Sequence, residues 1–136
     1  MQGTGKGIAA MAAVWRLAVA VAAGWMMPAH AGWTPVQGGE HGYDYADFAT
    51  LQIDGTVRRI WVLSDLLQPD RDGDRSYRNQ LEFHCGQSRY RALQTLYHRG
   101  PMGSGQVSAR SAVPSAWREA GEGTIAASVM QQVCAR

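Results

Sequence analysis

The sequence contains two cysteines, Cys85 and Cys134, and they constrain the fold of the chain strongly. Cys85 ends a segment with strand-like alternation, Cys134 lies in a carboxy-terminal segment with helical spacing, and an apolar leader precedes both. Disulfides persist in oxidising compartments such as the periplasm and the cell exterior. The sequence therefore predicts an exported protein in which a Cys85–Cys134 disulfide joins a strand to a helix.

Residues 1–31 have the pattern of a secretory signal peptide. Lys6 and Arg16 precede an apolar run over residues 17–27, and residues 28–31 (Pro-Ala-His-Ala) supply a breaker and a small-residue cleavage site. The run is too short to cross a bilayer, which needs about 20 apolar residues, so a retained anchor is only the alternative. We expect cleavage after Ala31, and Met11 is an alternative start because residues 11–31 form a leader by themselves.

Removing the leader leaves residues 32–136, a length typical of one domain. Of the 13 basic side chains, Lys6 and Arg16 belong to the leader, so 11 remain, all arginine, against 11 acidic ones. A domain without net charge gives no reason to expect a nucleic-acid partner. Guanidinium groups suit carboxylates, sulfates and phosphates, although GC-rich codon usage also explains the arginines.

Apolar residues alternate with a period of two through most of the domain, which predicts strands. We expect strands at residues 33–37, 42–46, 51–53, 57–67 and 106–110, with turns at 47–50 and 54–55 and a central hairpin around Gly86-Gln87. Thr124 can cap a helix over residues 125–135, whose apolar residues share one face. The predicted fold class is α+β: an antiparallel β-sheet of about five to six strands packed against a C-terminal α-helix, with one disulfide.

The central hairpin can be aligned residue by residue. Gly86-Gln87 fits a two-residue type II′ turn. Counting outward predicts a largely apolar face with the pairs Cys85–Ser88, Phe83–Tyr90, Leu81–Ala92 and Tyr77–Leu96. The opposite face then carries the pairs His84–Arg89 and Glu82–Arg91, together with Arg78, Thr95 and Tyr97. We expect Glu82–Arg91 to be an exposed ion pair that adds little stability.

Asp70, Asp72 and Asp74 have the spacing with which a calcium loop begins. However, Gly73 and Leu81 stand where the EF-hand pattern has other residues, including the glutamate at its twelfth position. We therefore predict a solvated loop.

His41, His84 and His98 do not share a metal-type spacing with one another, with an acidic residue or with a cysteine. The glycines of residues 100–105 are expected to turn the chain, because no strand-to-helix context for a phosphate loop follows them. We expect a non-enzymatic protein without catalytic, metal-binding or cofactor-binding residues.

Several segments together resemble the surface-adhesin protein E family of exported bacterial proteins. They are residues 76–107 (SYRNQLEFHCGQSRYRALQTLYHRGPMGSGQV), Val133-Cys134, Trp33, Tyr43-Asp44-Tyr45 and residues 59–63 (RIWVL). Their order and spacing extend the resemblance over nearly the whole mature chain. The resemblance implies an antiparallel sheet packed on a carboxy-terminal helix, with the two cysteines joined.

The resemblance also implies a surface protein that binds host matrix and serum glycoproteins, chiefly laminin and vitronectin, with links to haemin and to dimer formation. The family's binding segment resembles residues 78–99 here. The candidate partner-binding residues are accordingly Arg78, His84, Arg89, Arg91, Tyr97 and Arg99. Residues 32–136 lack the lysines of such adhesins, and the leader lacks their lipidation cysteine, so a periplasmic or secreted location is expected more than display on the cell surface.

Two functional hypotheses follow. In the first, a non-enzymatic module docks acidic glycoproteins or sulfated glycans on the arginine-bearing hairpin face. In the second, a soluble periplasmic carrier or accessory protein holds haem or a small apolar ligand between sheet and helix. A visible absorption spectrum separates the two, because bound haem absorbs in the visible range.

Overall fold

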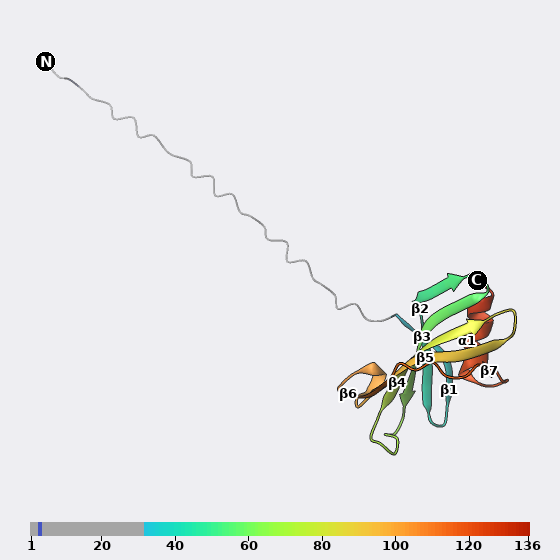
Figure 1. The fold of residues 1–136 in the computed structure, drawn as a ribbon. Helices are drawn as coiled ribbons and strands as arrows, with labels where there is room; N and C mark the ends of the chain where they lie inside the picture. Colours follow the sequence, from blue (N-terminus) through green and yellow to red (C-terminus); the bar gives the residue numbers. More distant parts are fainter. Residues whose placement is uncertain (1–2, 4–31) are drawn as a thin grey trace.

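The computed structural model describes Gly3 and residues 32–136, so the predicted leader lies, apart from Gly3, outside the described residues. Six antiparallel strands lie side by side in sequence order, a short strand β7 pairs with β5, and the helix α1 packs on one face (Figure 1). The elements are β1 (Trp33–Gly39), β2 (Gly42–Asp54), β3 (Val57–Leu66), β4 (Ser76–His84), β5 (Arg89–His98), the 3-10 turn η1 (Pro101–Gly103), β6 (Val107–Ser111), β7 (Arg118–Glu119) and α1 (Ile125–Cys134). The predicted α+β fold class is confirmed. Within the described residues, no helix is long and apolar enough to cross a membrane.

The main core lies between α1 and the strands β2, β3 and β4. It consists of the buried residues Ala46, Ile60, Val62, Leu81, Phe83, Ala126, Val129 and Val133. Burying a side chain as large as Ile60 or Phe83 stabilises the fold by roughly 1.5–3 kcal/mol. The helix begins as predicted, since the Thr124 hydroxyl accepts a hydrogen bond from Ala127 N at 3.2 Å.

Strand β2 continues through the segment predicted to be a turn at residues 47–50. The β2–β3 register shifts between Asp47 and Gln52, so the segment is a bulge inside one long strand. Thr50 fills the gap in the ladder, because its hydroxyl donates to Asp47 O at 2.6 Å and accepts from Trp61 N at 3.0 Å. Side-chain hydrogen bonds thus replace the missing backbone bonds.

The turn between β4 and β5 differs from the predicted type II′ turn. Residues 85–88 all lie outside the strands, Gly86 does not adopt a positive φ, and Ser88 has a φ of 51°. Cys85 N donates instead to Thr56 O, in the β2–β3 turn, at 2.9 Å. The adjacent Phe83–Tyr90 pair keeps the predicted register, as does the rest of the turn end of the hairpin.

A second bulge lies in β5 at Leu93. Leu81 pairs with Ala92, but Gln80 pairs with Gln94, so Leu93 has no partner on β4. Beyond it, each residue of β5 is shifted by one position relative to the prediction. Tyr77 consequently pairs with Tyr97 rather than Leu96, and Asn79 pairs with Thr95. Thr95 and Tyr97 therefore lie on the helix side of the sheet, and their predicted place on the polar side is wrong.

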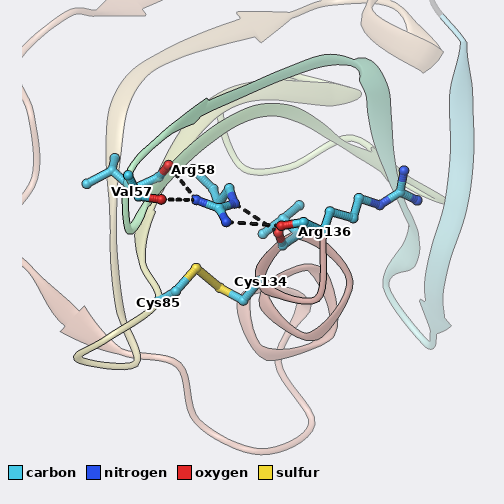
Figure 2. The surroundings of a disulfide bond; sticks show 7 residues. Val57, Arg58, Cys85, Cys134 and Arg136 are labelled. Atoms are coloured by element: carbon cyan, nitrogen blue, oxygen red, sulfur yellow. Dashed lines mark hydrogen bonds between the residues drawn. A yellow bond between two sulfur atoms is a disulfide. The ribbon is translucent and has the colours of Figure 1, made fainter.

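The disulfide between Cys85 and Cys134 is present and fastens the end of α1 to the β4–β5 turn (Figure 2). Beside it, the buried Arg58 side chain donates from Nε to Val133 O at 3.1 Å and from Nη2 to Arg136 O at 3.0 Å. The carbonyl groups at a helix carboxy-terminus lack partners within the helix and carry partial negative charge. Arg58 supplies both the donors and the positive charge.

The opposite face of the sheet is covered only at the end remote from the disulfide. There η1 and its flanking residues lie over a small group of buried side chains, Leu63, Ser76, Leu96 and His98. The Ser76 hydroxyl holds this segment, because it donates to Gly100 O at 2.7 Å and accepts from Gly103 N at 2.8 Å. The rest of that face, toward the β4–β5 turn, carries polar side chains.

We predict that the double substitution Cys85→Ser and Cys134→Ser lowers the free energy of unfolding by about 4 kcal/mol, because the disulfide closes a segment with a sequence separation of 49. Urea denaturation measures the change. Reducing the wild-type protein should reproduce the loss, while a reductant should leave the double variant unaffected. Equal stability of variant and wild type would contradict this role.

Replacing Arg58 with Met should lower the free energy of unfolding by about 2 kcal/mol, because the charged hydrogen bonds to the helix end are lost while most of the packed side-chain volume is kept. Amide hydrogen exchange in the last turn of α1 should accelerate. The exposed Arg110 on β6 provides the control, and Arg110→Met should change neither quantity. If the two variants behave alike, Arg58 does not hold the helix end.

Candidate functional site

The candidate site is the uncovered side of the sheet opposite α1, which we call the polar face. Residues of β3, β4 and β5 form rows across it, because directly paired residues on neighbouring strands point to the same side. Three rows are Val57–His84–Arg89, Arg59–Glu82–Arg91 and Trp61–Gln80–Gln94, and Trp117 adjoins them. Arg78 follows in the next row, between Leu63 and Leu96.

The central row holds a shared carboxylate between two guanidinium groups. Arg59 Nε donates to Glu82 Oε2 at 2.6 Å, and Arg91 Nε donates to Glu82 Oε1 at 2.8 Å. Arg91 Nη2 lies 2.8 Å from the same oxygen and adds an ion pair. The Glu82 side chain is 5% exposed, while those of Arg59 and Arg91 are 33% and 31% exposed. The prediction of an exposed Glu82–Arg91 pair is wrong, because a third strand contributes Arg59 and the three side chains cover one another.

The electrostatics of this row keep Glu82 ionised. Burial raises the pKa of Glu82, but the hydrogen bonds and charges of Arg59 and Arg91 lower it more, so the pKa lies below the ordinary value of 4.5. A guanidinium group has five N–H donors. Among residues 32–136, the hydrogen bonds use one donor nitrogen of each guanidinium group, which leaves further donors on two side chains that are about one-third exposed.

Trp117 joins the polar face from the segment between β6 and β7. The Arg91 guanidinium lies 4.5 Å from the centre of its ring, and the His84 ring meets it edge to face at 6.4 Å. Ser115, two residues before Trp117, is held against β5 by two hydrogen bonds. Ala92 N donates to the Ser115 hydroxyl at 3.0 Å, and Ser115 N donates to Ala92 O at 2.8 Å. Trp117 was not among the predicted site residues, since no periodic pattern marks this loop.

Arg78 lies where the polar face meets the η1 segment. Its Nε donates to Nε2 of the buried His98 at 2.9 Å, and its guanidinium carbon lies 6.0 Å from the Trp61 ring centre. Burial and the Arg78 charge hold the pKa of His98 below its ordinary value of 6.5. As the pH falls, His98 is therefore protonated in the unfolded chain at a higher pH than in the folded protein. The free energy of unfolding consequently decreases as the pH falls below 6.5.

The structure divides the six predicted partner-binding residues into two groups. Arg78, His84, Arg89 and Arg91 lie on the polar face, while Tyr97 lies on the helix side because of the bulge at Leu93. Arg99 follows β5 and contacts the loop at residues 70–74 instead.

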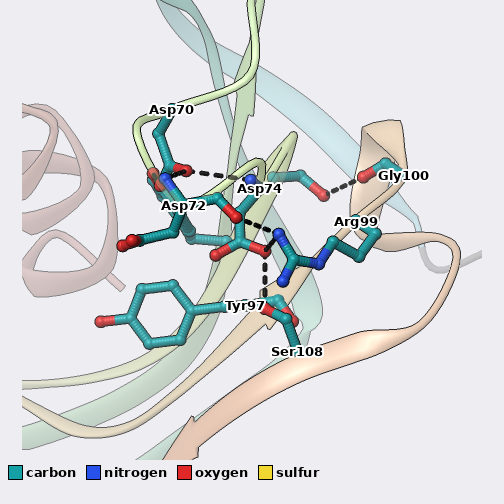
Figure 3. A network of polar contacts seen from close by, with 9 residues as sticks. Asp70, Asp72, Asp74, Tyr97, Arg99, Gly100 and Ser108 are labelled. Carbon is teal, nitrogen blue, oxygen red and sulfur yellow. Dashed lines mark hydrogen bonds and ion pairs between the residues drawn. The ribbon is translucent and has the colours of Figure 1, made fainter.

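Arg99 belongs to a separate network with the loop at residues 70–74 (Figure 3). Arg99 Nη1 lies 3.5 Å from Asp74 Oδ1 and also donates to Asp72 O, and Ser108 donates to Asp74 at 2.6 Å. The Asp70 carboxylate accepts from the backbone N–H groups of Asp72 and Asp74 at 2.9 Å. These aspartates thus order their own loop and Arg99, and no group of acidic, His or Cys side chains in the described residues is arranged to hold a metal ion.

A hollow of about 210 Å³ touches both α1 and the sheet. Its lining includes Val62, Leu81, Tyr90 and Ile125. Pockets that bury small ligands commonly measure about 300–1,000 Å³, so this hollow is small for a ligand of the size of haem. This hollow therefore gives little support to a carrier that holds haem between sheet and helix.

Replacing Glu82 with Gln should lower the free energy of unfolding at pH 7 by about 2 kcal/mol, because the charged partner of Arg59 and Arg91 is lost. Since the folded-state pKa of Glu82 is depressed, its contribution is complete above pH 4.5 and disappears as the pH falls through that pKa. The difference between variant and wild type should thus shrink in acid. Glu119→Gln on β7 is the control variant. A difference in the free energy of unfolding between Glu82→Gln and wild type that stays constant at all pH values would contradict the role assigned to Glu82.

Comparisons with known proteins agree with this fold. Residues 33–135 match the family described as Surface-adhesin protein E. A structure of Haemophilus influenzae protein E shares 16% identity, covers 78% of this chain and 86% of its own, and has a TM-score of 0.56. A second crystal form of that protein shares 17% identity, covers 68% and 80%, and has a TM-score of 0.53. No curated protein sequence gave a match. The chain belongs to the surface-adhesin protein E family.

Proposed function

We propose that this protein is an exported, non-enzymatic binding module that attaches to anionic host macromolecules through its polar face. The observation that carries the proposal is the Arg59–Glu82–Arg91 row, in which one buried carboxylate holds two partly exposed guanidinium groups that keep further donors. Guanidinium groups bind carboxylate, sulfate and phosphate through paired hydrogen bonds. Membership of an adhesin family supports the same conclusion.

The fixed guanidinium groups of the polar face, rather than its net charge, support an anionic partner. Within β3, β4 and β5 its rows carry Arg59, Arg78, Arg89 and Arg91 against Glu82. The neighbouring strands add Asp47, Asp54, Arg110 and Glu119 on the same side of the sheet. The proposal therefore rests on paired hydrogen bonds from positioned guanidinium groups and not on a positive field over the whole face.

We propose glycoproteins of the host matrix or serum, laminin and vitronectin, as the partners. We further propose that residues 1–31 are a cleaved leader, that residues 32–136 are the mature domain, and that the protein acts in the periplasm or after secretion. Homodimer formation stays a prediction.

Arg89 is the best position at which to test the polar face, because its side chain is exposed and takes part in none of the salt bridges among residues 32–136. Arg89→Ala should leave the free energy of unfolding unchanged and weaken binding to immobilised laminin or vitronectin by up to about fivefold. Wild-type binding should fall as salt rises above about 0.1 M, since exposed charges are then screened beyond about 10 Å.

Arg91 is unsuitable for that test, contrary to the sequence-based expectation, because its removal would leave Glu82 short of a partner and destabilise the fold. Arg118→Ala on β7 is the matched control, because Arg118 is exposed and pairs with Tyr90, which lies on the helix side of the sheet. A loss of binding in Arg118→Ala equal to that in Arg89→Ala would refute the assignment of the face. An absence of wild-type binding at low salt would refute the proposed function itself.

A further inference from the structure

We infer that the ligand recognised by the polar face is an anionic glycan, carried by the partner, rather than an acidic peptide segment. This inference rests on the proposed function and adds the chemical class of the ligand. It depends on the neutral row of the face, Trp61–Gln80–Gln94, which lies next to the charged row along the same three strands.

The neutral row offers hydrogen-bonding groups that carry no charge. Gln94 Nε2 donates to Gln80 Oε1 at 2.8 Å, so the two amides fix each other across β4 and β5. Each amide has two N–H donors and one carbonyl oxygen, and this single bond leaves the Gln80 amino group and the Gln94 carbonyl oxygen for a ligand. A donor and an acceptor side by side suit the hydroxyl groups of a sugar, each of which both donates and accepts.

Two indole rings border these rows on opposite sides. Trp61 lies on β3 at one end of the neutral row, and Trp117 lies beyond β5 beside Arg91. Trp117 keeps 37% of its surface exposed. The negative face of an aromatic ring attracts the C–H groups that cover the faces of a sugar ring. The backbone of an acidic peptide can also pair with the amides, but its carboxylate side chains offer no apolar ring face to the two indoles.

The two rows together match the alternating chemistry of a sulfated or uronate-containing glycan. Its anionic groups would bind the remaining donors of the partly exposed Arg59 and Arg91, and its hydroxyls and ring faces would meet the amides and indoles. The guanidinium and amide groups are already held by Glu82 and by each other, so little side-chain freedom is lost on binding.

The test compares two double variants on the same two strands. Gln80→Ala with Gln94→Ala removes the amide pair of the polar face without changing any charge. Asn79→Ala with Thr95→Ala is the matched control, because it removes a paired hydrogen bond of 2.6 Å on the opposite side of the sheet. The probes are a heparin decasaccharide and poly-L-glutamate of similar total charge, with affinities measured by calorimetry.

We expect wild type to bind the decasaccharide more tightly than poly-L-glutamate, and the Gln80/Gln94 variant to lose about tenfold in affinity for the decasaccharide alone. The Asn79/Thr95 variant should match wild type with both probes. Equal affinity of wild type for the two probes, or an unchanged decasaccharide affinity in the Gln80/Gln94 variant, would overturn the glycan inference and favour an acidic peptide.

Failure of this inference is distinguishable from failure of the proposed function. Suppose that laminin or vitronectin binds wild type, binds Arg89→Ala more weakly, and binds the Gln80/Gln94 variant as tightly as wild type. The assignment of the polar face is then upheld, and the inference that the ligand is a glycan is wrong. Removal of glycans from the immobilised glycoprotein gives an independent readout. Undiminished binding to the deglycosylated protein would also overturn the inference.

Discussion

The attachment of α1 at its carboxy-terminal end is the constraint on which the rest of the structure depends. A helix of 10 residues is marginal by itself, since isolated helices shorter than about 12–15 residues seldom persist in water. The Cys85–Cys134 disulfide and the hydrogen bonds from Arg58 hold that helix against the sheet. The apolar side chains of β3 and β4 are thereby covered on one face. The other face then needs no second layer along its whole length and can carry charged groups.

A local irregularity decides which hairpin residues act together on that face. Without the bulge at Leu93, alternation along β5 would place Tyr97 and Arg99 on the same side as Arg89 and Arg91. With it, Gln94 moves beside Gln80 and completes the neutral row, while Tyr97 packs edge to face on Tyr77 at 5.2 Å. One extra residue thus separates a polar face near the turn from the loop network at the other end of the strands.

The sequence predicted the elements that depend on short-range pattern. The Asp54-Gly55 turn, the Thr124 cap and the pairing of Phe83 with Tyr90 follow from residues close to one another in the chain, and all are present. The bulge at Leu93 escaped prediction because no glycine or proline marks it. The burial of Glu82 also escaped, since it requires Arg59 from a third strand. Contacts of that kind, like those of Arg58 and Trp117, depend on tertiary packing that one segment does not encode.

The position of Glu82 explains how a domain without net charge can present guanidinium groups in fixed positions. A carboxylate between two arginines reduces the charge of the face by one, which by itself weakens attraction for an anion. In return it fixes two guanidinium groups that would otherwise sample many rotamers, and ordering such side chains on binding costs about 0.5–1.5 kcal/mol each. Because both arginines are hydrogen-bonded to Glu82 and about one-third exposed, their guanidinium groups are accessible in a defined position. The face is therefore suited to selecting among anions by geometry rather than to holding any anion by charge alone.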